Sequence, residues 1–321
     1  MLISFDTKLA VSVFLAFTVI FSQLSFESRA EMCGKWGDAE KVGVLDYSLI
    51  NEASGIQASV KYPGRLYHIN DSGGGQNFYI TDIKGNQTQK IKIEGEGIKK
   101  SDFEALGMGE CGDKSCLIVG DIGDNKVTKQ FVEIIVIEEL PEYGGSAKPL
   151  RRIKLKYPDQ PHNAEGMAVH PNADLFIITK EENLRDYEAY PAKVYKLPAE
   201  KWRNTQNSEQ KLTYVGDIDL RVLNPSGTAY GQVVSAMDIA PDGKSFLVLT
   251  YENAIEFNID LSKDSLKSSS QLQKGKDYNI IEIKSLPQQE SISYTPDGKG
   301  FIYSTEYHWF EAPILKVDCL D

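Results

Sequence analysis

The sequence predicts an all-β protein that folds as one five-bladed β-propeller, closed by a strand from its N-terminal part. Three observations predict this fold. Apolar residues alternate with polar ones along most of the chain, and five similar strand openings recur along it. The last repeat is one strand short, while a strand-like segment precedes the first. Regular repeats of this kind, each made of strands, are typical of propeller blades.

The first part of the chain predicts a targeting signal. Residues 9–26 form an apolar run behind Lys8, and Ser28-Arg29-Ala30 matches a small-x-small cleavage pattern. We therefore expect a secretory signal peptide over residues 1–30 and a single mature domain over residues 31–321. An uncleaved membrane anchor is the alternative, because the run is nearly long enough to span a bilayer. No second apolar stretch follows, so no membrane span is expected after cleavage.

The charge of the chain argues against one class of partner. The sequence has 35 Lys and Arg residues against 46 Asp and Glu residues, a formal net charge of -11. A phosphate backbone has to be met by clustered basic residues, so nucleic-acid polymers are not expected partners. We expect a secreted or periplasmic monomer that binds a small-molecule substrate or a ligand of the envelope or extracellular space.

Export favours disulfides, because oxidising compartments favour pairing and all four cysteines lie in the expected mature domain. Cys111 and Cys116 flank Gly-Asp-Lys-Ser, a tight-turn sequence that favours a local bridge across a hairpin. That bridge leaves Cys33 with Cys319, near the two ends of the mature chain. Three connectivities are possible. A zinc site competes with them, but the sequence lacks two short Cys-x-x-Cys pairs and its four histidines are scattered.

Strands are expected along almost the whole mature chain. Period-two alternation is found, for example, in residues 66–69, 78–80 and 246–250. Turn sequences such as Pro241-Asp242-Gly243 and Pro296-Asp297-Gly298 recur between strands. Only residues 199–208 have the character of a short helix.

The blades can be placed by aligning prolines that end similar strands. A Ser or Glu stands six positions before Pro171, Pro241 and Pro296, and the same pattern recurs twice nearer the N-terminus. The five anchors are Ser54, Glu104, Glu165, Ser235 and Glu290. Successive anchors are separated by roughly 50–70 residues, and each interval accommodates a four-stranded antiparallel blade with its loops. The longest interval, from Glu165 to Ser235, carries an insertion around residues 203–230.

The last blade has to borrow a strand, because the chain ends at Asp321, too soon after Glu290 for four strands. Residues 41–50 have strand character and can complete it, which would close the ring and remove its exposed edges. A Cys33–Cys319 bridge would staple the same closure. The alternatives are a β-sandwich, two smaller domains, or a propeller with a sixth blade built from the insertion.

The anchors predict a metal site. The first strand of each propeller blade lines the central channel, so the five anchors should converge at one mouth as three carboxylates and two hydroxyls. Grouped carboxylates repel one another unless a cation compensates them. Ca²⁺ prefers an all-oxygen cage, whereas Zn²⁺ prefers His or Cys. We predict calcium bound by the five anchors; the alternative is that they lie at the rim in separate solvated pockets.

A second group of polar residues follows the second strands of the blades. Asp71 and Asp121 stand at the same offset from their anchors, and Lys180, Tyr251 and Glu306 stand at nearly that offset from theirs. These residues should border the metal. We predict that Asp71 and Asp121 are catalytic carboxylates that orient or deprotonate a water molecule.

Two loops of this group combine glycine with Asp or Asn, namely Asn70-Asp71-Ser72-Gly73-Gly74-Gly75 and Gly120-Asp121-Ile122-Gly123-Asp124-Asn125. Glycine allows a backbone to approach a ligand closely. The predicted ligand-binding residues are Asn70, Asp124, Asn125, Lys180, Tyr251 and Glu306. Simple hairpin turns use the same residue types, which is the alternative interpretation.

These motifs resemble a family of secreted bacterial propellers. The resemblance rests on both loops and on Asn163-Ala164-Glu165-Gly166, and it covers nearly all of the mature chain. It implies a fold sooner than an activity, because the family is poorly characterised. The anchor order Ser-Glu-Glu-Ser-Glu is also similar to the calcium-activated nucleotidases, or apyrases, which are five-bladed propellers with a central Ca²⁺.

The nucleotidase resemblance implies that the five anchors are calcium ligands and that Asn70-Asp71 forms an acidic pair beside the ligand site. The chain departs from that pattern after Ile178, where Thr-Lys-Glu-Glu contains one basic residue and the nucleotidases are richer in arginine. Bidentate arginine is the usual partner of a polyphosphate. Phosphate clamping is therefore disfavoured, since Lys180, Lys126 and Arg221 could replace arginine only in part.

Two functions of different classes follow. The first is a Ca²⁺-dependent hydrolase of a phosphoester or nucleotide, or of an ester or lactone, in which the ion polarises a substrate oxygen. The second is a non-catalytic binding or scaffold propeller of the bacterial envelope with a structural calcium. The sequence contains no Gly-x-Ser-x-Gly elbow, His-Glu-x-x-His, P-loop or dinucleotide fingerprint, which disfavours nucleophilic serine catalysis.

Overall fold

The computed structural model describes residues 1, 32–71, 75–96, 101–183, 188–205, 208–263, 265–306 and 311–321. Glu31–Asp321 forms one compact unit. Apart from Met1, the expected signal segment lies outside the described residues, as do residues 72–74 of the first glycine-rich loop, so both stay predictions. Within the described ranges, no helix is both long and apolar enough to cross a membrane.

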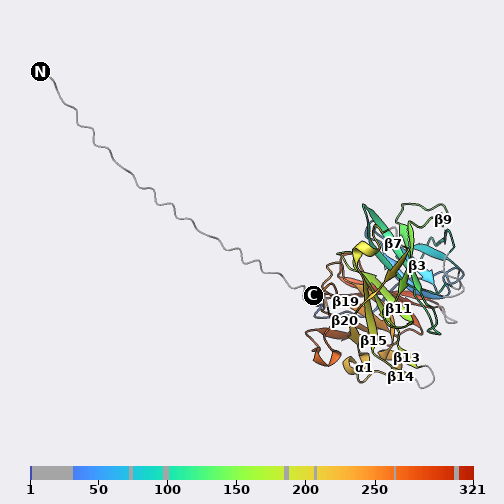
Figure 1. The fold of residues 1–321 in the computed structure, drawn as a ribbon. Helices are drawn as coiled ribbons and strands as arrows, with labels where there is room; N and C mark the ends of the chain where they lie inside the picture. The colour runs from blue at the N-terminus through green and yellow to red at the C-terminus, as the bar shows by residue number, and fades with distance from the viewer. Residues whose placement is uncertain are drawn as a thin grey trace. The chain divides into compact units, whose positions relative to one another are not determined.

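Five of the β-sheets among the described residues are the blades of a propeller (Figure 1). A sixth, two-stranded sheet pairs β13 (Glu182–Asn183) with β14 (Glu188–Ala189). Most blade strands follow one another in the chain, and β9, β16 and β1 each join a blade from elsewhere in the sequence. Blade 1 contains β2 (Ala53–Ala58), β3 (Arg65–Asn70), β4 (Asn77–Asp82), β5 (Gln89–Ile93) and, parallel to β5, β9 (Ser146–Ala147). Blade 2 contains β6 (Phe103–Cys111), β7 (Lys114–Asp121), β8 (Val132–Glu138), β10 (Arg151–Lys156) and, parallel to β10, β16 (Glu209–Lys211).

The remaining blades have four strands each. Blade 3 contains β11 (Ala164–Val169), β12 (Leu175–Thr179), β15 (Ala192–Leu197) and β17 (Thr213–Ile218). Blade 4 contains β18 (Val234–Ile239), β19 (Phe246–Thr250), β20 (Ala254–Phe257) and β21 (Tyr278–Ile281). Blade 5 contains β22 (Gln289–Tyr294), β23 (Gly300–Thr305), β24 (Pro313–Asp318) and β1 (Glu40–Val44). The predicted five-bladed propeller is confirmed.

The ring closes through the N-terminal strand, as predicted. β1 pairs antiparallel with β24 and becomes the outer strand of blade 5. It is shorter than the predicted range of residues 41–50, because the chain turns away after Val44, where Leu45 N donates to Ala312 O. Cys33 and Cys319 form a disulfide beside this pairing, with their Cα atoms 5.7 Å apart. The two ends of the domain are thus joined in one blade.

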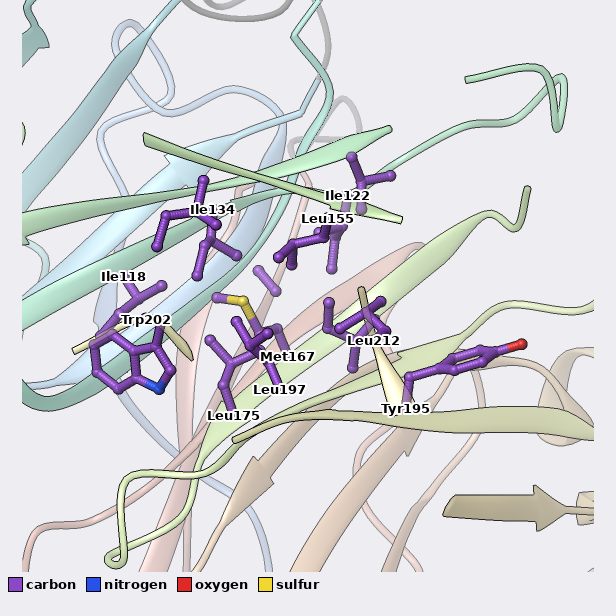
Figure 2. Close-up of a cluster of buried hydrophobic side chains, with 14 of the residues drawn as sticks. Ile118, Ile122, Ile134, Leu155, Met167, Leu175, Tyr195, Leu197, Trp202 and Leu212 are labelled. Carbon is purple, nitrogen blue, oxygen red and sulfur yellow. The ribbon is translucent and has the colours of Figure 1, made fainter. Parts of the chain in front are cut away.

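The hydrophobic interior is divided into five clusters, each packed between two neighbouring blades. Figure 2 shows the cluster between blades 2 and 3, where Ile118 and Ile134 face Met167 and Leu175. These inner strands are almost entirely buried because both faces of every blade meet a neighbour. Burial of this kind contributes about 25 cal/mol per Å² of apolar surface, so each blade depends on the two beside it.

Helical structure among the described residues is minor. The helix predicted over residues 199–208 is wrong in extent: of residues 199–205 and 208, which the structure describes, only Ala199–Lys201 form a 3-10 turn, η1. The turn ends because Trp202 is buried and donates through Nε1 to Ala173 O, which pulls the chain onto blade 3. The insertion supplies β16 and β17 and the short α1 (Leu220–Leu223) and η2 (Ala229–Gln232), so it does not build a sixth blade.

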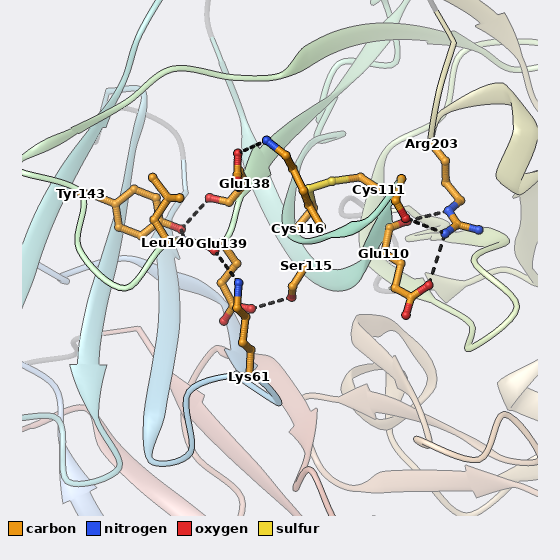
Figure 3. Close-up of a disulfide and its surroundings, with 12 residues drawn as sticks. Lys61, Glu110, Cys111, Ser115, Cys116, Glu138, Glu139, Leu140, Tyr143 and Arg203 are labelled. Carbon is orange, nitrogen blue, oxygen red and sulfur yellow. Dashed lines mark hydrogen bonds and ion pairs between the residues drawn. A yellow bond between two sulfur atoms is a disulfide. The ribbon is translucent and has the colours of Figure 1, made fainter.

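The second cysteine pair lies across the β6–β7 hairpin (Figure 3). Cys111 and Cys116 have Cα atoms 5.9 Å apart, and the structure joins them as a disulfide. Arg203 Nε donates to Glu110 O on the same hairpin at 2.7 Å. With Cys33–Cys319, this pair leaves no free cysteine among the described residues.

Two buried carboxyls give the fold an expected pH dependence. Burial raises the pKa of Asp238 and of Glu256 to about 7. Because these pKa values are raised on folding, the stability they contribute is present below about pH 4 and is lost as pH rises through 7. We expect the unfolding free energy, measured by urea denaturation, to fall between pH 5 and pH 8 by about 2 kcal/mol per group, since one pKa unit corresponds to about 1.4 kcal/mol.

The contribution of Glu256 can be isolated by the substitution Glu256→Gln. An amide can still accept the hydrogen bond from Trp36 Nε1, which lies 3.1 Å from Glu256 Oε2. The variant should therefore lose less stability than the native protein over the same pH range. Equal pH slopes for the two proteins would show that Glu256 does not titrate with a raised pKa.

Candidate functional site

All five anchors lie in β-bulges. In each blade the pairing between the first and second strands shifts by one residue at the anchor, for example between Ala53 and Gly55, which flank Ser54. The same shift occurs at Glu104, Glu165, Ser235 and Glu290. A bulge inserts one residue that has no direct partner opposite it and re-aims its side chain. Equivalent bulges in five blades therefore place five equivalent side chains at one level of the channel.

The anchors are buried at the channel mouth. Each is at most 6% exposed. Ser54, Glu104, Glu165 and Glu290 border a common cavity of about 10 Å³ between the first strands. This volume is close to the minimum that holds one water-sized particle. Ser235 does not border it, but its hydroxyl is fully buried and has no hydrogen-bond partner among the described residues.

One half of the ring gathers carboxylates. Ser54 Oγ donates to Glu104 Oε2 at 2.7 Å. Oxygens of Asp71, Asp102 and Glu104 all lie within 4.8 Å of one another. Burial, followed by the charges of Glu165 and Asp71, raises the pKa of Glu104 well above its ordinary value. Burial also raises the pKa of Asp102 to about 6, against the attraction of nearby Lys129.

The other half of the ring is compensated within the protein. Lys180 Nζ donates to Glu165 Oε1 at 3.2 Å and to the Tyr251 hydroxyl at 2.7 Å. Tyr251 in turn donates to Glu290 Oε1 at 2.6 Å. Burial alone would lower the pKa of Lys180, but the carboxylates, Glu165 first, raise it well above its ordinary value. An ammonium therefore already neutralises this side, and the three glutamates are not equivalent.

The Gly120–Asn125 loop packs against the carboxyl group of Glu104 through Gly123. A Cβ atom on Gly123 would clash with Glu104 Oε1, so only glycine fits there. Asp124 N donates to Asn163 Oδ1, and Asn163 Nδ2 donates to Asn125 Oδ1 and to Glu165 Oε1. Asp124 and Asn125 thus fasten blade 2 to blade 3 and orient Glu165 through Asn163.

Three predicted residues form hydrogen bonds within the protein, while Asp121 Oδ2 is buried without a hydrogen-bond partner among the described residues. Asp121 is fully buried, and its Oδ1 accepts from Asp102 N at 2.9 Å and lies 3.6 Å from Lys129 Nζ. Asn70 donates to Leu49 O and accepts weakly from Glu52 N. Asp124 Oδ2 accepts from Lys129 N at 2.6 Å. These contacts support the surrounding loops.

A layer of residues above the anchors was missed by the sequence analysis. Asp102, Asn163 and Gln288 each stand two positions before an anchor, just before the first strand of their blade begins. Asp102 contributes to the carboxylate cluster, and Asn163 contacts Glu165. Gln288 Nε2 donates to Glu306 Oε2 at 2.8 Å. Burial, followed by the charge of Asp71, raises the pKa of Glu306 to about 7. The i-2 spacing was the available signal.

A pocket of about 590 Å³ opens beside the ring and reaches it through Lys180 and Tyr251. Its lining also includes Glu182, Glu252, Tyr230 and Pro287. Of the described residues that line it, Lys180 is the only basic one. The site thus combines a carboxylate cluster, an ammonium and a cavity of substrate size at one channel mouth.

Comparisons with known proteins assign neither a family nor an activity to the chain. No model of a known protein family matches the chain, and no curated protein matches it. The hydrazine synthase of Kuenenia stuttgartiensis is similar over 81% of this chain and 58% of its own, with 14% identity and a TM-score of 0.39, so the chain spans less than two thirds of that protein. A putative oxidoreductase (glucose dehydrogenase) of Thermus thermophilus is similar over 88% of this chain and 100% of its own, with 9% identity and a TM-score of 0.46.

Proposed function

We propose that the protein is an exported, calcium-binding propeller that hydrolyses a small ester, lactone or phosphoester at its channel mouth. The observation that supports this most is the cluster of Asp71, Asp102 and Glu104, whose oxygens lie within 4.8 Å of one another. Ca²⁺ binds oxygen at about 2.3–2.6 Å, so two ligands of one ion lie at most about 5 Å apart. The Cys33–Cys319 disulfide is consistent with export to an oxidising compartment.

The donor set fits calcium. Asp71, Asp102 and Glu104 would hold the ion, and Ser54 fixes one oxygen of Glu104. Burial, followed by the charges of Glu165 and Asp71, raises the pKa of Glu104, and a bound cation would stabilise its carboxylate form. The other four anchors remain predicted ligands. A bound calcium ion would polarise a carbonyl or phosphoryl oxygen of the substrate.

The side chains of the site would supply the proton acceptor, a positioning residue and a hydrogen-bond donor. Asp71 lies at the edge of the cluster and is only partly buried, so one of its carboxylate oxygens would hold the ion while the other accepts a proton from water. Asp121 instead holds the backbone of Asp102 and has no exposed surface, so we assign it a positioning role. Lys180, held by Glu165 and Tyr251, can donate to an oxygen that gains negative charge.

The reaction can be tested with the variant Asp71→Asn. We expect the mature protein with excess calcium to hydrolyse a member of a panel of aryl esters, lactones, phosphoesters and nucleotides. Loss of the proton acceptor should lower kcat about 100-fold, the usual contribution of a general base. Asp113→Asn, at an exposed turn of the β6–β7 hairpin, is the control and should keep full activity.

The outcome also separates enzyme from binding protein. Hydrolysis that persists unchanged in Asp71→Asn would remove this residue from the mechanism. Inactivity of the native protein on the whole panel, with calcium binding intact, would favour the second candidate function, a non-catalytic envelope-binding propeller.

One observation favours that second function. Polar contacts across the channel join successive blades: Ser54 bonds Glu104, Asn125 bonds Asn163, Lys180 bonds Tyr251, and Tyr251 bonds Glu290. Gln57 Nε2 completes the circle by donating to Ser293 Oγ of blade 5 at 3.1 Å. A calcium ion in such a ring would lock the blades without taking part in chemistry.

A further inference from the structure

The pocket beside the ring is built by two connections between blades. One wall is the segment with η2, where Tyr251 N donates to Tyr230 O at 3.1 Å and Thr228 N donates to Glu252 Oε2. The facing wall precedes β22, where Ser285 Oγ donates to Tyr251 O at 2.9 Å. Both walls are therefore tied to the end of β19, and the pocket between them has a volume of about 590 Å³.

The floor of the pocket carries a donor beside an acceptor. An ammonium has three N–H donors, and Lys180 directs two of them at Glu165 and Tyr251. Glu182 lies 3.9 Å from Lys180 Nζ, beyond hydrogen-bond distance, and its side chain is 21% exposed. One N–H of Lys180 and a carboxylate oxygen of Glu182 thus lie side by side, at a spacing that two adjacent hydroxyl groups of one ring can bridge.

The walls offer flat apolar faces. Tyr230 is 56% exposed, and its ring meets that of Tyr251 edge to face, with centroids 6.3 Å apart. Leu286 and Pro287 line the other side. Tyrosine rings bury the carbon face of a ligand while their hydroxyls stay available for hydrogen bonds. This combination suits a ring that is apolar on its faces and hydroxylated at its edge.

The charge of the pocket excludes strongly anionic ligands. Glu182 and Glu252 line it, and Glu165 and Glu290 lie directly behind Lys180 and Tyr251. One ammonium facing these carboxylates cannot compensate the several charges of a polyphosphate. A neutral ligand meets no such repulsion, and its hydroxyls can use both the donor and the acceptor.

We propose that this pocket binds a neutral carbohydrate ring, with adjacent hydroxyls bridging Lys180 and Glu182 and a ring face against Tyr230. The inference rests on the proposed function only in taking this pocket as the substrate side of the hydrolase, and it narrows the proposed substrate to an ester or lactone that is carried on such a ring. The test below measures sugar binding without turnover. A protein that binds no sugar and a protein that hydrolyses no substrate are therefore distinguishable results.

The experiment is saturation-transfer NMR and calorimetry on the mature protein with glucose, galactose, mannose and N-acetylglucosamine, and with ATP as the anionic counter-probe. At least one sugar should bind, with or without calcium, and ATP should not. Tyr230→Ala and Glu182→Gln should each weaken sugar binding about tenfold, which is the effect of roughly 1.4 kcal/mol. Both substitutions lie at partly exposed positions, so the fold should be retained.

The matched control is Tyr214→Ala, which removes a tyrosine that is 47% exposed on β17 and does not line the pocket. Its sugar affinity should equal that of the native protein. Absence of binding for all four sugars would overturn the proposal. So would equal affinity in Tyr230→Ala, Glu182→Gln and the native protein, or competition of ATP for the same site.

Discussion

Excess calcium is expected to raise the melting temperature of the chelated protein by roughly 5–10 °C. A ligand present at about 100 times its Kd stabilises the folded state by about 2.7 kcal/mol, and each kcal/mol shifts the melting temperature of a domain of this size by about 2–4 °C. The physical source is binding of the ion to the folded state alone, because folding is what brings Asp71, Asp102 and Glu104 together. Differential scanning calorimetry with chelator and then with calcium measures the shift.

The variant Glu104→Gln locates the ion. In chelator it should melt close to the native temperature, because the raised pKa of Glu104 already favours the neutral form that glutamine mimics. In calcium it should lose most of the shift. Glu110→Gln is the matched control, since Glu110 lies on the same strand with its side chain 81% exposed. A native protein without a calcium shift, or an equal shift in Glu104→Gln, would contradict the central-metal proposal.

Removing the Cys33–Cys319 disulfide should cost about 5 kcal/mol of unfolding free energy, because in the chain-entropy model the stabilisation grows with the length of the closed loop. The bridge joins residues 286 apart in the sequence. The same bridge holds the N-terminal segment that carries β1, without which blade 5 has three strands. Urea denaturation of the Cys33→Ala, Cys319→Ala double variant measures the loss.

The second cysteine pair supplies the control for that measurement. Cys111 and Cys116 are separated by only 5 positions, so the same model gives about 2 kcal/mol for their removal by Cys111→Ala and Cys116→Ala. The long-range pair should therefore cost more than twice as much. Equal losses for the two double variants would show that ring closure does not depend on the Cys33–Cys319 bridge.

The blade arrangement was predictable because it depends on short sequence patterns that repeat along the chain. Period-two alternation places strands, and five anchors at blade-length intervals define the repeat. The strand that closes the ring was found by counting the strands left after Glu290. The sequence did not predict that this strand ends at Val44. Its end is set by the hydrogen bond from Leu45 N to Ala312 O, and Ala312 lies near the other end of the domain's sequence.

The convergence of the candidate site was predictable, but its division into two halves was not. Anchor spacing indicates that Glu104, Glu165 and Glu290 meet. It does not indicate that Lys180 reaches back to Glu165 or that Tyr251 caps Glu290, because these contacts depend on side-chain direction across neighbouring blades. Asp102 was overlooked for the same reason, since its role depends on Asp71 from another blade.

Because the five anchors lie in bulges, their side chains can change without changing how the strands of each blade pair. Elsewhere in a strand, changing a residue alters a cross-strand pair and the packing of a blade face. At a bulge, the side chain has no such partner, so its identity can change while the ladder keeps its register. At Ser235, which is fully buried, the hydroxyl has no hydrogen-bond partner among the described residues, so replacing it by another small side chain breaks no hydrogen bond. The side chains at the channel mouth can therefore differ between related propellers while the pairing of the blades stays the same.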